Sequence, residues 1–232
     1  MLLEVLQERD LPEIFQVISE YQEHLLLNPL FIALCHQDER VRFHAVCCFG
    51  RIVPAIADKD PEAARVVMRR FLWSLNDESG GIGWGAPEAM AEIMCHSESL
   101  RQEYLHMLIS YMREDGDEPF QDGNYIELPM LQREVLRGIG RLVQCHRSEM
   151  LGRHLADDVA AYLQSSDQEV VGLAIWCLGM LGNGADSVKI EPFLDNETEV
   201  TLYIDDVLQK PTVGQLAGNA LQLIGTHANS SH

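Results

Sequence analysis

Apolar residues recur with helical spacing along most of the chain. Between Val170 and Leu181 they occupy positions i, i+3, i+4, i+7, i+8 and i+11, which places them on one face of a helix. The same period runs through segments 41–56, 131–142 and 216–224. The pattern predicts a mainly helical protein.

The helical segments also repeat one another. In four of them a small or β-branched residue is followed five positions later by glycine, as at Ala174 and Gly179. A fifth segment keeps the alanine, Ala89, and has Met94 in place of the glycine. The five small residues, at 45, 89, 135, 174 and 220, are separated by 44, 46, 39 and 46 residues. Repeats built from helix pairs have this period, and small residues let neighbouring helices approach closely.

Proline and acidic residues mark where helices begin. We expect helices to start at Asn28-Pro29, after Asp60 and at Ser148-Glu149. Asp38 and Asp167 each precede an apolar run, so they are expected to accept hydrogen bonds from the first free backbone N–H groups.

The order of residues within one repeat resembles the signature of HEAT repeats. It consists of an aspartate, a valine three residues later, an alanine four further on and a glycine five beyond, as in Asp38, Val41, Ala45 and Gly50. The short helices that end at glycine resemble most the HEAT-like repeats of the phycobilisome-lyase type. The resemblance covers residues 28–225 and implies an all-α, right-handed α-solenoid of about five helix pairs. Such families include scaffolds, chaperone-like lyases and a few enzymes.

The period changes from about 3.6 to about 2 over residues 199–213, where β-branched residues surround a candidate turn at Asp205-Asp206. This predicts a small β-hairpin inserted in the last repeat. We therefore expect a single domain over residues 1–232. Its expected parts are N-terminal capping helices (1–27), repeats (28–198), the hairpin (199–213), a last helix (214–226) and a tail (227–232).

A glycine-rich turn at 76–88 is the first candidate site. Four glycines surround Trp84, and Asp77, Glu78 and Glu88 lie nearby in the sequence. An aromatic platform beside carboxylates would suit a cationic or amphipathic group of a partner. The alternative is that Trp84 belongs to the core of a helix–helix turn.

A second candidate is the acidic loop 115–129, whose length is typical of functional loops. It adds Asp122 and Tyr125 to the expected partner-binding residues. A calcium loop does not fit, because Pro119 stands at the fifth position counted from Asp115. A solvated acidic loop is the simpler interpretation.

Charge narrows the classes of partner. The 232 residues include 17 Lys and Arg against 36 Asp and Glu, a formal charge of −19, which disfavours nucleic acid and anionic membranes and favours a basic protein or peptide. No apolar run is long enough for a membrane span. Six cysteines without disulfide-like spacing indicate buried thiols in a reducing cytoplasm.

No pattern of reactive residues predicts catalysis, a metal or a cofactor. The three Cys-His pairs, which begin at Cys35, Cys95 and Cys145, lack zinc-ligand spacing. The His-Glu dipeptides that bind iron in HEAT-repeat hydroxylases are also missing. We expect a non-catalytic scaffold or adaptor that binds a protein or peptide. The alternative is a cofactor-handling, lyase-like chaperone with a small-molecule site near Trp84.

Overall fold

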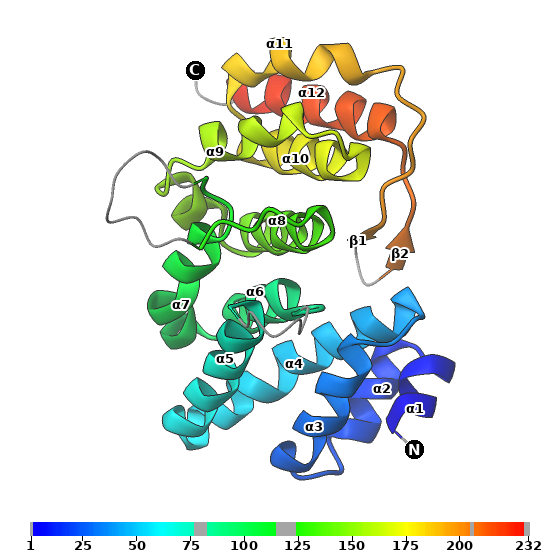
Figure 1. The fold of residues 1–232 in the computed structure, drawn as a ribbon, viewed down its shortest axis with the longest axis vertical. Coiled ribbons are helices and arrows are strands. Elements are labelled where there is room, and N and C mark those ends of the chain that lie inside the picture. Colours follow the sequence, from blue (N-terminus) through cyan, green and yellow to red (C-terminus); the bar gives the residue numbers. More distant parts are fainter. Residues whose placement is uncertain (1, 77–82, 115–123, 205–206, 230–232) are drawn as a thin grey trace. The chain divides into compact units, whose positions relative to one another are not determined.

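The computed structural model describes residues 2–76, 83–114, 124–204 and 207–229 (Figure 1). The chain forms two compact units, Met1–Leu108 and Ile109–His232, each of which is described by itself. Within the described residues, no helix is long and apolar enough to cross a membrane.

The first unit consists of helices that pack on their neighbours in the sequence. They are α1 (Leu2–Glu8), α2 (Leu11–Ile18), α3 (Glu23–Leu34), α4 (Glu39–Lys59), α5 (Pro61–Leu75), α6 (Ala86–His96) and most of α7 (Glu98–Ser110). The long helix α4 packs against α1, α3, α5 and α6. Its buried His44 donates a hydrogen bond from Nδ1 to the carbonyl oxygen of Leu6, at 2.7 Å, and so holds α1 in place.

The second unit is built around three long helices. In chain order its elements are α8 (Pro129–Leu151), α9 (Ala156–Ala161), α10 (Gln168–Leu181), α11 (Ser187–Ile190), β1 (Leu202–Ile204), β2 (Val207–Gln209) and α12 (Val213–Asn229). Short 3-10 turns follow α9 and flank α11. Helix α10 packs between α8 and α12 and also contacts α9.

Acidic residues cap the helices as the sequence predicts. Asp167 Oδ1 accepts hydrogen bonds from the backbone N–H groups of Glu169 and Val170, at 3.0 and 3.1 Å. Asp38 caps α4 in the same way, and Asp60 caps α5. These side chains satisfy N–H groups that have no partner within the helix.

One predicted helix start is wrong, and a second is right only in part. Helix α3 begins at Glu23, so Pro29 lies inside it. Proline removes the hydrogen bond to the carbonyl of Leu25, but Leu25 is on the exposed side of the helix, where water can satisfy that group. The start expected at Ser148-Glu149 lies just after a kink in α8, where His146 has φ of −138° and ψ of 47°. That segment ends at Leu151, however, and α9 begins separately at Ala156.

The small residue of each repeat is buried, as its spacing predicts: Ala45, Ala89, Val135, Ala174 and Ala220 are 0–2% exposed. The glycine that follows it has the expected packing role in α10, where a Cβ on Gly179 would lie 2.6 Å from the Cα of Ala220 in α12. At Gly225 in α12 the expectation fails, since nothing lies within 4 Å of such a Cβ.

The predicted hairpin is present. Strands β1 and β2 pair antiparallel with Leu202 opposite Gln209 and Ile204 opposite Val207, and a further bridge joins Glu199 to Thr212. The expected turn residues at 205–206 lie outside the described residues. The prediction of an all-α fold with one small inserted hairpin is thus confirmed for the described residues.

Candidate functional site

Packing explains two glycines of the turn before α6. Gly85 has φ of 68°, in the left-handed region, and a Cβ there would lie 2.8 Å from Cδ2 of Leu34. A Cβ on Gly83 would lie 2.8 Å from Cδ2 of Leu75. Because close packing and positive φ account for these glycines, neither requires a ligand.

Three of the six predicted partner-binding residues are among those that the structure describes. Trp84 and Glu88 are half-buried in the first unit, and Tyr125 is half-buried in the second. The hydroxyl of Tyr125 accepts a hydrogen bond from Nε2 of Gln132 at 3.2 Å. Three further residues lie outside the described residues: Asp77, Glu78 and Asp122. The site around Trp84 therefore stays a prediction.

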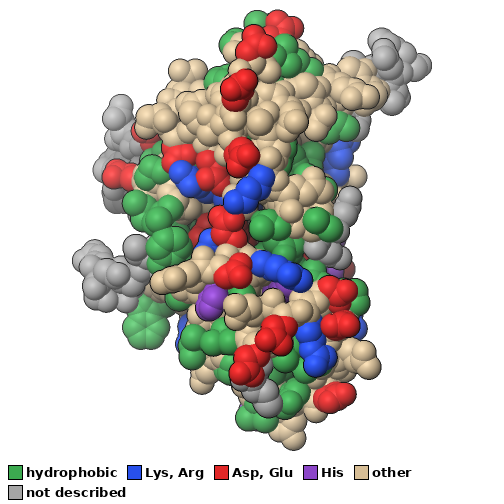
Figure 2. Space-filling model, turned by 90° about the vertical axis from the view of Figure 1, so that its right-hand side faces the viewer, with side chains coloured by type: hydrophobic (Ala, Val, Ile, Leu, Met, Phe, Trp, Pro, Cys, Tyr) green, Lys and Arg blue, Asp and Glu red, His purple; other side chains and the backbone are tan. Residues whose placement is uncertain are grey.

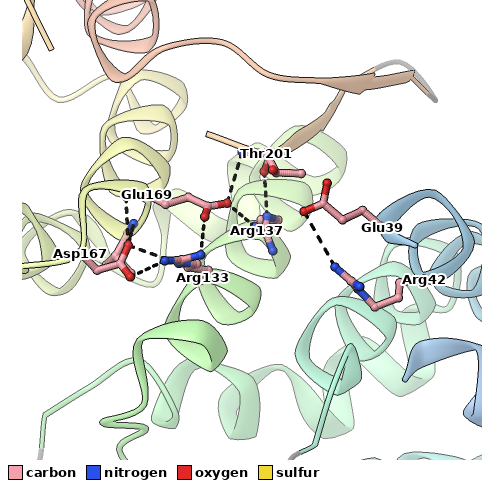
Figure 3. Close-up of polar contacts among 8 residues, drawn as sticks. Glu39, Arg42, Arg133, Arg137, Asp167, Glu169 and Thr201 are labelled. Atoms are coloured by element: carbon pink, nitrogen blue, oxygen red, sulfur yellow. Dashed lines mark hydrogen bonds and ion pairs between the residues drawn. The ribbon is translucent and has the colours of Figure 1, made fainter. Parts of the chain in front are cut away.

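A cluster of ion pairs joins α8, α10 and the segment before β1 (Figure 3). Arg133 lies 2.5 Å from both Asp167 Oδ2 and Glu169 Oε2. Arg137 donates from Nη2 to Glu169 Oε1 at 2.8 Å and from Nε to the carbonyl oxygen of Thr201 at 2.9 Å. The side chains of the four charged residues are only 16–33% exposed, so this cluster holds the base of the hairpin against α8 and α10.

Electrostatics support that structural role. Burial raises the pKa of Asp167, but hydrogen bonds from Arg133 and from the backbone N–H groups of Val170 and Glu169 outweigh it and hold the pKa below its usual value. The carboxylate therefore stays ionised at neutral pH and cannot act as an acid there. Figure 3 also draws a surface pair within α4, between Arg42 Nη2 and Glu39 Oε1 at 3.9 Å.

Two buried cysteines are not suited to be nucleophiles. Burial raises the pKa of Cys48 to about 12 and also raises the pKa of Cys177. Thiolates are the nucleophilic form, so these two cysteines are packing residues. Among the residues that the structure describes, no group of His, Cys, Asp and Glu could hold a metal ion.

A different surface, on α3 and α5, has the features of a binding site. Three phenylalanines connect these helices through α4: the ring of Phe31 lies 4.7 Å from that of Phe71 and 4.9 Å from that of Phe49, between centroids. Phe49 and Phe71 are fully buried. Aromatic contacts of this kind fix α3 and α5 on a common base.

Helices α3 and α5 run in the same direction. Lys59, two residues before the start of α5, pairs with Glu23 at the start of α3. Farther along, Arg70 of α5 donates from Nη1 to Oδ1 of Asn28 in α3, at 2.8 Å. Its guanidinium also lies over the ring of Phe31, 3.7 Å from the centroid.

Four large apolar side chains are exposed on these two helices. Leu25 and Ile32 of α3 are 58% and 64% exposed, and Val66 and Trp73 of α5 are 55% and 76% exposed. Each pair is seven residues apart and so lies on one side of its helix. Asn28 lies between Leu25 and Ile32 along α3, and Arg70 lies between Val66 and Trp73 along α5, so their hydrogen bond connects the two helices between the exposed residues. We call these six residues the α3–α5 face.

Comparisons with known proteins find similar proteins but do not assign a function to this chain. No protein-family model matches the chain. A protein of Archaeoglobus fulgidus described as "Uncharacterized protein" is 27% identical over 196 residues, which are 80% of this chain and 95% of that protein. A solved structure of computationally designed armadillo repeat proteins for modular peptide recognition matches with a TM-score of 0.45 and 15% identity. The match covers 96% of this chain and 90% of that chain.

The α3–α5 face is not predicted by the sequence patterns, although one signal points toward it. Trp73 stands four residues before Asp77, on the helix that leads into the glycine-rich turn. On the surface seen in Figure 2, carboxylates and basic side chains are interspersed. Identifying the face requires knowing that α3 and α5 lie next to each other and expose these residues on the same side of the first unit.

Proposed function

We propose that the protein is a non-catalytic scaffold that binds a protein or peptide partner. The observation that carries this proposal is the α3–α5 face, where four large apolar side chains are each more than half exposed on two linked helices. Exposed apolar patches mark interaction surfaces, since water contact with them is unfavourable. Their arrangement on helices fixed by buried phenylalanines suits binding without rearrangement.

Three finer expectations belong to this proposal. A HEAT-like repeat of the phycobilisome-lyase type is supported by buried small residues at spacings of 39–46 positions. A partner with a basic patch is supported by the net charge of −19. A cytoplasmic location is supported by the six cysteines, none of which is in a disulfide.

The proposal can be tested by capturing partners from the native cell with wild-type protein and with Trp73→Ala. The control is Val188→Ala, because Val188 in α11 is 74% exposed, much as Trp73 is. We expect a protein that is retained by wild type and by Val188→Ala but lost with Trp73→Ala. After purification, this partner should bind directly to wild type and to Val188→Ala, but not to Trp73→Ala.

Equal retention by all three proteins would refute the α3–α5 face as the binding surface. Loss of the partner with Trp84→Ala, but not with Trp73→Ala, would instead support the site predicted at the glycine-rich turn. A bound small molecule that is lost with Trp84→Ala would favour the lyase-like alternative.

A further inference from the structure

The α3–α5 face has the spacing of a helix-binding surface. Its apolar residues form two levels along the helices, Leu25 and Val66 before the Asn28–Arg70 contact and Ile32 and Trp73 after it, and the two residues of each helix are seven positions apart. Seven residues of α-helix span about 10 Å. A third helix laid along α3 and α5 would meet both levels with apolar residues that are also seven positions apart, since these lie on one side of a helix.

A positive charge stands between the two levels. Arg70 is exposed, and its contacts are the hydrogen bond to Asn28 and the ring of Phe31. Among the residues that the structure describes, no carboxylate pairs with Arg70. The neighbouring arginines of α5 differ, because Arg69 pairs with Glu62 at 2.6 Å and Arg65 with Glu103 at 2.8 Å.

That difference points to the partner's chemistry. The chain has about twice as many acidic as basic residues, 36 against 17, yet the arginine at the centre of the apolar face lacks an acidic partner among the described residues. A guanidinium beside apolar surface forms strong, directional hydrogen bonds with a carboxylate, and more so when a bound partner excludes water. The face is therefore complementary to an apolar surface that carries one carboxylate.

We propose that the α3–α5 face binds an amphipathic helix of a partner protein, with apolar residues seven positions apart and an Asp or Glu midway between them. The inference rests on the proposed scaffold function and deepens it by naming what the face recognises. A partner can have a net positive charge and still present one carboxylate to Arg70. The acidic residues elsewhere on the chain would then attract the basic part of the partner, while Arg70 binds its one carboxylate.

A second copy of the chain fits this face less well. Two copies that meet through the same surface would bring Arg69 and Arg70 of each against those of the other, with no carboxylate supplied for Arg70. Two chains of charge −19 also repel each other at long range.

The first test selects ligands without assuming their sequence. A displayed library of helical peptides, randomised along one face, is selected on the full-length protein and counter-selected on the double variant Ile32→Ser/Trp73→Ala. Both replaced side chains are more than 60% exposed, so the variant should melt at nearly the wild-type temperature. We expect enrichment of apolar residues at i and i+7 and of Asp or Glu at i+3 or i+4.

The second test isolates the charge. One enriched peptide is labelled, and its affinity is measured by fluorescence anisotropy for wild type, Arg70→Met and Arg51→Met. Arg51 is the matched control, because it is also exposed and lies 5.8 Å from the ring of Phe15. We expect Arg70→Met to weaken binding about tenfold and Arg51→Met to leave it unchanged. A peptide with Lys in place of the acidic residue should bind Arg70→Glu better than wild type.

Each alternative outcome has a definite meaning. Enriched peptides that bind wild type and the Ile32→Ser/Trp73→Ala variant equally would overturn the inference. Binding that depends on Trp73 but not on Arg70 would refute the acidic helix and leave the proposed scaffold function intact. A wild-type dimer that Trp73→Ala dissociates, seen by sedimentation, would overturn the inference in favour of self-association. Failure of the scaffold function itself would appear in the capture experiment instead.

Discussion

Alanine at two equivalent glycines should change stability in opposite directions. Gly179 and Gly225 both lie five residues after the small residue of their repeat. A Cβ on Gly179 would lie 2.6 Å from both Cα and Cβ of Ala220, whereas nothing lies within 4 Å of a Cβ on Gly225. The same substitution therefore meets the backbone of a neighbouring helix at one position and open space at the other.

The magnitudes follow from two opposing effects. Replacing glycine by alanine within a helix gains about 1 kcal/mol. At Gly225, near the end of α12, fraying should reduce this gain to about 0.5 kcal/mol. At Gly179 the new methyl group would clash with a backbone atom of Ala220, which cannot rotate away, so overpacking should cost about 1–3 kcal/mol beyond the gain. We expect Gly179→Ala to lower the free energy of unfolding by about 1–3 kcal/mol.

Urea unfolding of the full-length variants, followed by circular dichroism, measures both values. In the Gly179→Ala background, Ala220→Gly should recover part of the loss, because it removes the methyl group of residue 220 and leaves its backbone in place. If Gly179→Ala is as stable as Gly225→Ala, the close approach of α10 and α12 is wrong, and with it the packing reason for the repeated glycine.

Four further results are expected. Trp84→Ala should cost about 2 kcal/mol of stability, because the ring is half-buried, whereas the exposed Trp73→Ala should cost less than about 0.5 kcal/mol; thermal melts compare them. Asp167→Ala should cost about 1–2 kcal/mol in urea unfolding through loss of the cap of α10. Burial lowers the pKa of His44 below its usual 6.5, so the unfolded chain binds a proton more readily and stability falls as pH drops below about 6.5. His44→Asn should flatten that decline in melts between pH 5 and 8. Binding of a basic partner should weaken as salt rises, by titration calorimetry; an affinity that stays flat would contradict an electrostatic contribution.

Much of the fold could be predicted because it depends on local pattern. The spacing of apolar residues correctly predicted that Ala174 is buried in the core. The change of period at 199–213 correctly predicted the position of the hairpin. Asp167 was recognisable as a cap because its bonds reach only two and three residues along the chain. The predicted helix start at Pro29 was wrong, because proline is tolerated inside a helix when the carbonyl that loses its hydrogen bond can be hydrated. The sequence does not show whether that carbonyl is exposed.

The binding surface could not be predicted in the same way. Ile32 and Trp73 are apolar residues at helical spacing, and a sequence pattern does not show whether such residues face the core or water. Their relation depends on Arg70 contacting Asn28 across 42 positions of sequence. The glycine-rich turn was conspicuous for a simpler reason: Gly83 and Gly85 allow close packing against Leu75 and Leu34.

The α3–α5 face is suited to recognition because the core fixes its base. Phe49 and Phe71 are fully buried and contact Phe31, so the backbone beneath the face is held in place. Arg70 is held in turn by Asn28 and Phe31. A partner therefore orders few groups when it binds, and the entropic cost of association is small relative to that for a flexible loop. Substitutions at the exposed positions should then change affinity while the fold beneath them stays intact.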